Sequence, residues 1–197
     1  MSSAPLLIDS LDFAPLIALK KAKEWDRIGD ILAQSARRLE QGGASAVMIC
    51  SNSMHKIFDQ VEDAVDVPVL HIADCVGASM KEANASDAAL LGTRFVTTEN
   101  FYRRRLVTHG VNLSPPDLNI VEEVDGIIYS ELMRGKATRD AERSLRTIIT
   151  RKEQEGAQSI VLACTELEMI VDVDANVLPI FDSTTIHCKA AADWILG

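Results

Sequence analysis

The sequence repeats itself once, and this repeat restricts the fold more than any other feature. Segment 43–53 (GASAVMICSNS) aligns without a gap on segment 156–166 (GAQSIVLACTE). Each copy has a Gly-Ala turn, an apolar run and a polar cluster. Farther along, 67–71 (VPVLH) resembles 178–182 (LPIFD), with a slip of two residues. Two related β-α-β units are the simplest explanation.

Short apolar runs alternate with amphipathic stretches along the chain. Strands are expected at 5–9, 46–50, 67–72, 88–92, 117–121, 159–163 and 178–181. Helices are expected from Trp25 to the Gly pair at 42–43, and over 137–155. This alternation predicts an α/β fold with parallel sheets flanked by helices. We expect two similar lobes, residues 1–84 plus 181–197 and residues 85–180, with the active site in the cleft between them.

Composition narrows the class of protein. The chain is 47% hydrophobic and 25% charged, as in packed globular proteins. A net charge of −9 argues against a nucleic-acid partner. We interpret the basic run 103–105 as a solvated helix face rather than an anion site. No apolar run approaches the ~20 residues that span a bilayer, and no signal peptide is apparent, so a cytoplasmic protein without a membrane partner is expected.

The two polar clusters of the repeat follow the predicted strands directly. Parallel sheets bind ligands beyond the carboxyl ends of their strands, so the clusters are candidate site loops. The repeat places Ser51 opposite Cys164 across the cleft. Cys50 lies one residue earlier, on the other face of its strand, and is expected in the core. Cys75 and Cys188 are expected to pack within helices, and the cysteine spacing indicates neither a metal site nor disulfides.

These loops resemble those of the cofactor-independent aspartate/glutamate racemase superfamily. The resemblance rests on CSNSMH (50–55) and VLACTELEMI (161–170), and it extends to LLGTRFVTTENFY (90–102) and FDSTTIH (181–187). It covers essentially the whole chain. Ser51 stands where the family has its first catalytic cysteine, as in members with a hydroxyl residue there.

The resemblance implies racemisation of aspartate or glutamate without pyridoxal phosphate or any other cofactor, in a homodimer. Cys164 would be the thiol base, because the pKa of cysteine lies near neutral pH. The Ser51 hydroxyl is a much weaker base, so the site would be asymmetric. By residue match, the substrate-binding residues would be Lys20, Asn52, Ser53, Met54, Thr93, Lys136 and Thr165, supported by Glu166 and His187. Ser53 and Thr165 as helix caps, and Lys136 as a solvated lysine, are the alternatives.

One departure affects the first lobe. Family members open with a strand and a Gly-rich loop of the type GGMSWES before the segment that matches 6–13. The first lobe is therefore expected to lack its usual first strand. A one-thiol decarboxylase or isomerase of a dicarboxylate, or an inactive N-terminally shortened homologue, are the alternative functions.

Overall fold

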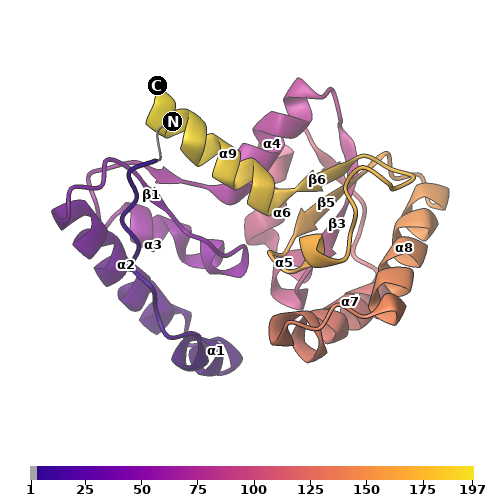
Figure 1. Cartoon of the computed structure of the whole chain (residues 1–197), viewed down its shortest axis with the longest axis horizontal. Coiled ribbons are helices and arrows are strands. Elements are labelled where there is room, and N and C mark those ends of the chain that lie inside the picture. The colour runs from indigo at the N-terminus through magenta and orange to yellow at the C-terminus, as the bar shows by residue number, and fades with distance from the viewer. Residues whose placement is uncertain (1–3) are drawn as a thin grey trace.

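The computed structural model describes residues 4–197, which form two parallel sheets with helices around them (Figure 1). The small sheet pairs β1 (Val47–Met48) with β2 (Val69–Leu70). The large sheet has the order β4-β3-β5-β6, from β3 (Asp87–Gly92), β4 (Asn112–Leu113), β5 (Ser159–Ala163) and β6 (Ile180–Asp182). The predicted α/β class with parallel sheets is confirmed.

The helices cover both sheets. They are α1 (Phe13–Lys21), α2 (Trp25–Gln41), α3 (Phe58–Glu62), α4 (Ile72–Glu82), α5 (Arg94–Thr98), α6 (Asn100–Thr108), α7 (Leu118–Ser130), α8 (Arg139–Gln154) and α9 (Ser183–Leu196). Short 3-10 turns are η1 (Ser53–Ile57), η2 (Leu132–Arg134) and η3 (Leu167–Met169). The expected helices from Trp25 and over 137–155 are confirmed as α2 and α8.

The large sheet is covered on both faces, and residues 72–196 around it are called the large-sheet region. Ile160 and Leu162 of β5 pack against α7 and α8, whereas Val161 and Ala163 pack against α4 and α6. This alternation follows from the two-residue period of a strand. Every β5 residue is buried, as expected of a central parallel strand.

The small sheet has a core of its own, formed within residues 13–70, the small-sheet region. Leu16 of α1, with Ile28 and Leu32 of α2, packs on Val47 of β1. In α2 these apolar residues recur at helical spacing, and the helix ends before a glycine pair.

The edge of β1 away from β2 has no strand partner among residues 4–197. The irregular segment 4–12 runs along this side, and a cavity of about 450 Å³ lies between its residues 7–9 and residues 47–50. Leu7 and Ile8 are exposed. The absence of the family's first strand stays a prediction, and the unpaired edge of β1 leaves room for one.

The internal repeat is visible in the backbone. Gly43 and Gly156, aligned in the repeat, both have positive φ, +94° and +98°, where a side chain would be strained. Each ends a helix and turns the chain into the following strand.

The strand pairing is repeated as well. The Val47 N–H donates to the Pro68 carbonyl at 2.9 Å, and the Ile160 N–H donates to the Pro179 carbonyl at 2.9 Å. These four residues occupy matching positions in the two sequence copies. The β1-β2 pair and the β5-β6 pair are therefore equivalent, although among the described strands β5 has a further neighbour, β3, and β1 has none.

Two expected strands are absent, and one short strand was not expected. Residues 117–121 begin α7, because the Asp117 carboxylate accepts from the backbone N–H groups of Asn119 and Ile120 and caps the helix. Segment 5–9 forms no strand, and the short strand β4 was not predicted. The predicted division into lobes stays a prediction; β6 spans its boundary at 180/181, and α4 packs on the large sheet.

Candidate active site

Register brings two candidate residues to the same edge of the large sheet. Gly92, the last residue of β3, pairs with Ala163, the last residue of β5. A Cβ atom at Gly92 would lie 2.7 Å from the Ala163 carbonyl oxygen, so only glycine permits this close approach. Thr93 and Cys164 follow at the carboxyl ends of adjacent parallel strands, where ligands bind in such sheets.

The Cys164 thiol is paired with a carboxylate. Its side chain is buried, and its Sγ donates to Glu166 Oε2 at 3.0 Å. The same oxygen accepts from Thr165 Oγ1 at 2.8 Å. Burial raises the pKa of the thiol, and the negative charge of Glu166 raises it further. The resting thiol is therefore protonated, with a proton acceptor already in contact.

Four buried side-chain oxygens have no hydrogen-bond partner among the described residues, and two of them lie in the loops after β1 and β3. These two are Asn52 Oδ1, in the loop after β1, and Thr93 Oγ1, in the loop after β3. Asn52 is held in place because its Nδ2 donates to Ser183 Oγ of α9 at 3.1 Å. A buried polar atom without a partner costs about 1–3 kcal/mol. Both oxygens are therefore acceptors that the described chain leaves unused.

A buried lysine links the two regions. Lys20 of α1 is 5% exposed, and its Nζ donates to Ser53 Oγ at 3.0 Å and to Tyr129 Oη of α7 at 3.1 Å. Its ammonium lies 4.7 Å from the centre of the Phe95 ring. No carboxylate forms an ion pair with Lys20 within residues 4–197. Burial lowers its pKa, which the nearby charge of Asp125 opposes.

Tyr129 was not predicted as a site residue. The chain has two tyrosines, and Tyr129 is the only residue with a phenol on α7. That phenol near the end of an amphipathic helix was the available signal. Its partner Lys20 lies 109 residues away in sequence, so the sequence did not identify the pair.

Ser51 opens into the cavity beside β1. Thr165 and Glu166 line the same cavity, so the loops after β1 and β5 share one space. The Ser51 carbonyl accepts from His55 Nδ1 at 2.8 Å, which fixes the loop from behind. Cys50 also lines this cavity and is exposed, so its expected place in the core was wrong. β1 ends at Met48, and within residues 4–197 it has no second neighbouring strand to cover the residues that follow.

Three histidines pack behind this loop. The His55 ring lies 4.6 Å from the His71 ring and 5.8 Å from the His187 ring. Burial lowers the pKa of His55 to about 3, so the ring is neutral. His187 Nε2 donates to the Leu70 carbonyl at 3.0 Å, which ties α9 to β2. In this arrangement His187 supports the loop and makes no hydrogen bond to Cys164.

Two further predicted residues are not brought into contact with the thiol. Met54 is buried in the core of the small-sheet region. Lys136 lies in an exposed loop, and its side chain has no hydrogen bond or ion pair in the described chain. Cys188 is exposed on α9 rather than packed. The roles of Met54 and Lys136 stay predictions.

The described residues contain no cluster of three or more His, Cys, Asp or Glu side chains arranged to hold a metal. Over the same residues, no helix combines the length and the apolar character needed to cross a bilayer.

The fold and the site define a class of protein: parallel α/β proteins with a buried thiol–carboxylate pair at a strand end. The chain belongs to the Asp/Glu/hydantoin racemase family, whose model matches residues 2–191. A candidate Asp/Glu racemase from Yersinia pestis superposes with a TM-score of 0.92 at 35% identity, over 100% of this chain and 86% of that one. An aspartate racemase homologue from Pyrococcus horikoshii OT3 superposes with a TM-score of 0.84 at 29% identity, over 97% and 83%. The broad specificity amino-acid racemase RacX of Bacillus subtilis is 24% identical over 176 residues, 88% of this chain and 75% of RacX.

Proposed function

We propose that this chain is a cofactor-independent racemase of an acidic amino acid, aspartate or glutamate, with Cys164 as the thiol base and Ser51 on the opposite side of the substrate. The observation that carries the proposal is the hydrogen bond from the buried Cys164 thiol to Glu166. Family membership supports it. Assembly as a homodimer in the cytoplasm is part of the proposal and rests on the resemblance alone.

The distal carboxylate of the substrate would bind Lys20. The hydrogen-bond partners of the buried ammonium are neutral and no carboxylate is in contact with it, and a dicarboxylate substrate supplies one. Asn52 Oδ1 and Thr93 Oγ1 are unpaired acceptors for the substrate ammonium. Ser53 and Thr165 add hydroxyl donors for the α-carboxylate, with the backbone of Met54 and the side chain of Lys136 as further proposed contacts.

The proton path begins at the thiol. Transfer of the Cys164 proton to Glu166 leaves a thiolate, which the substrate ammonium stabilises. The thiolate then takes the α-hydrogen: an S–H bond forms, the C–H bond breaks, and the electron pair stays on the α-carbon. Ser51 delivers a proton from the other face. The proton held by Glu166 returns to Ser51 through solvent and resets the site.

Deuterium wash-in tests this proposal. The α-carbon of each enantiomer of aspartate and glutamate is followed by NMR in heavy water, together with chiral analysis of the product. Exchange with inversion is expected for at least one substrate. The rate should change little between pH 7 and pH 9, because the raised pKa keeps the resting thiol protonated over this range and its proton passes to Glu166 rather than to solvent.

Other outcomes would contradict the racemase proposal in distinct ways. Exchange without inversion would mean one working base, as in a one-thiol isomerase. Release of carbon dioxide from a dicarboxylate without wash-in would indicate a decarboxylase. Binding of aspartate or glutamate without any exchange would indicate an inactive homologue.

A further inference from the structure

A second cavity, away from Cys164, is lined by four basic side chains. It has a volume of about 820 Å³ and lies between the η1–α3 segment of the small-sheet region and α6 of the large-sheet region. Its cations are Lys56, Arg103, Arg104 and Arg105, and the one acidic side chain in its described lining is Asp59. We call it the arginine groove. Such a concentration of positive charge stands out in a chain with a net charge of −9.

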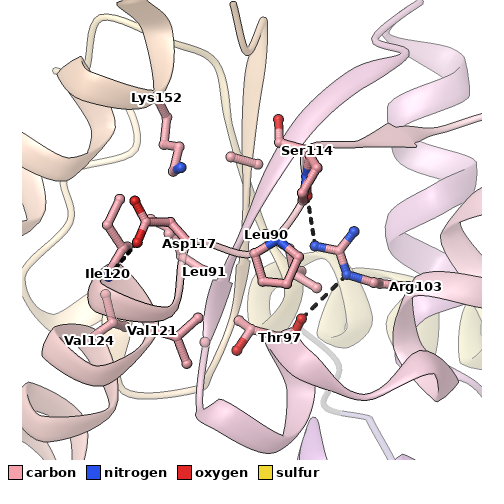
Figure 2. Close-up of a pocket in the computed structure, with 14 residues that line it drawn as sticks. Leu90, Leu91, Thr97, Arg103, Ser114, Asp117, Ile120, Val121, Val124 and Lys152 are labelled. Atoms are coloured by element: carbon pink, nitrogen blue, oxygen red, sulfur yellow. Dashed lines mark hydrogen bonds between the residues drawn. The ribbon is translucent and has the colours of Figure 1, made fainter. Parts of the chain in front are cut away.

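Arg103 is a fixed and uncompensated charge at the edge of this groove. Its Nε donates to the Thr97 carbonyl at 3.3 Å and its Nη2 to the Ser114 carbonyl at 2.8 Å (Figure 2). Burial lowers its pKa, and no carboxylate pairs with it within residues 4–197. A guanidinium has five N–H donors, and two of these are used. The interpretation of the run 103–105 as a solvated face was therefore wrong for Arg103.

The remaining cations differ in how far they are neutralised. Arg105 forms ion pairs with Asp74 at 2.8 Å and Asp59 at 3.6 Å. Lys56 pairs with Glu99. Arg104 is exposed, and the described residues offer it no ion pair or hydrogen bond. Among the described cations of the groove, Arg104 is thus the one with neither a carboxylate nor a hydrogen-bond partner.

The wall of the groove adds a donor and flat apolar surfaces. His71 Nδ1 accepts from the Ala73 N–H at 3.1 Å, and burial lowers the pKa of His71 to about 2. The ring is therefore neutral, and its proton resides on Nε2, a donor without a partner among the described residues. Phe58 and Phe101 supply aromatic walls, and the Arg105 guanidinium lies 5.0 Å from the centre of the Phe58 ring.

We propose that the arginine groove binds a small organic anion, in which a phosphate or carboxylate group is attached to an aromatic body. Arg104 would take the anionic group, because a guanidinium fork matches both oxyanions. The aromatic body would pack against Phe101, because Phe58 is only 3% exposed and its ring is already covered by the Arg105 guanidinium. This site is separate from the proposed racemase site and does not depend on it.

Calorimetric titration with chosen probes tests the groove. Adenosine monophosphate and benzoate represent the phosphate and carboxylate forms; adenosine and inorganic phosphate each lack one half of the ligand. At least one of the first two is expected to bind, more tightly than both fragments. Arg104→Gln should weaken that binding about tenfold, a loss of ~1.4 kcal/mol. Arg104 is exposed and unpartnered, so this variant should fold normally.

Matched variants decide where the anion binds. Arg143→Gln removes the same charge from α8, where the side chain is 77% exposed, and should leave binding unchanged. Lys20→Met, which alters the racemase site, should also leave it unchanged. The proposal is overturned if neither anion binds at about 10 mM, if Lys20→Met abolishes binding, or if Arg104→Gln and Arg143→Gln weaken it equally. Dissociation of a dimer by Arg104→Gln would also overturn it, since the groove would then be an interface.

Discussion

The two copies of the repeat share a backbone plan but differ in what surrounds it. β1 and β5 both follow a glycine with positive φ, and each pairs with the strand after it through a proline carbonyl. β5 is also paired with β3, has five residues and is buried throughout. β1 has two residues and a cavity on its other side.

This difference decides the environment of the loop that follows each strand. After β5, Cys164 is 4% exposed and hydrogen-bonded to Glu166. After β1, Cys50 is exposed and Ser51 is half-buried beside open space. A neighbouring strand on each side buries and orients the first residues of a strand-end loop. A strand followed by a polar loop is therefore not sufficient to form a buried site. A second neighbouring strand, such as β3 beside β5, is also needed.

Substitution of the two cysteines in the aligned segments, Cys164 and Cys50, is the most direct test of this difference between the two loops. Cys164→Ala should lower α-proton exchange by about 10²- to 10⁴-fold, since it removes the proposed base. Cys50→Ala removes the thiol that lines the cavity beside β1 and should leave exchange within about twofold. Rates of deuterium wash-in under identical conditions provide the measurement. Full exchange by the Cys164 variant, or loss of exchange in the Cys50 variant, would reverse the roles assigned to the two loops.

Lys20 allows a second test, because its hydrogen bonds join the small-sheet region to the large-sheet region. Lys20→Met keeps most of the buried volume but removes the charge, and KM for the acidic substrate should rise about 10- to 100-fold. Lys21→Met, at the exposed neighbour, is the matched control. Steady-state kinetics with aspartate and glutamate would measure both. Equal KM values in the two variants would mean that Lys20 does not bind the substrate carboxylate.

Much of the fold was predictable because local signals and tertiary context agree. Helical spacing before a glycine pair predicted α2, and fully apolar runs predicted β3 and β5. The repeat also identified both strand-end loops, including Cys164. In these segments the spacing of the apolar residues matches the face that is buried in the structure, and the predicted helix or strand was confirmed.

The wrong and missed predictions have a common physical cause. In each case the structure is determined by a helix cap or by a contact with a residue that is distant in sequence. Residues 117–121 are as apolar as a strand, but Asp117 caps a helix there. The exposure of Cys50 depends on which strand lies beside β1. The hydrogen bond from Lys20 to Tyr129 joins helices far apart in sequence. The spacing of apolar residues within a segment does not predict any of these contacts.

A matched pair of valines measures the difference in packing itself. Val161 of β5 is fully buried between two layers, whereas Val47 of β1 lines the cavity. Val161→Ala should lower the free energy of unfolding by about 1.5–3 kcal/mol. Val47→Ala should cost about half as much or less, because a side chain beside a void loses fewer contacts when it is shortened. Urea unfolding, with equal slopes for the two variants, gives both values. Equal losses would show that the small-sheet region is packed as tightly as the large one, and the openness around Ser51 would then need a cause other than the unpaired edge of β1.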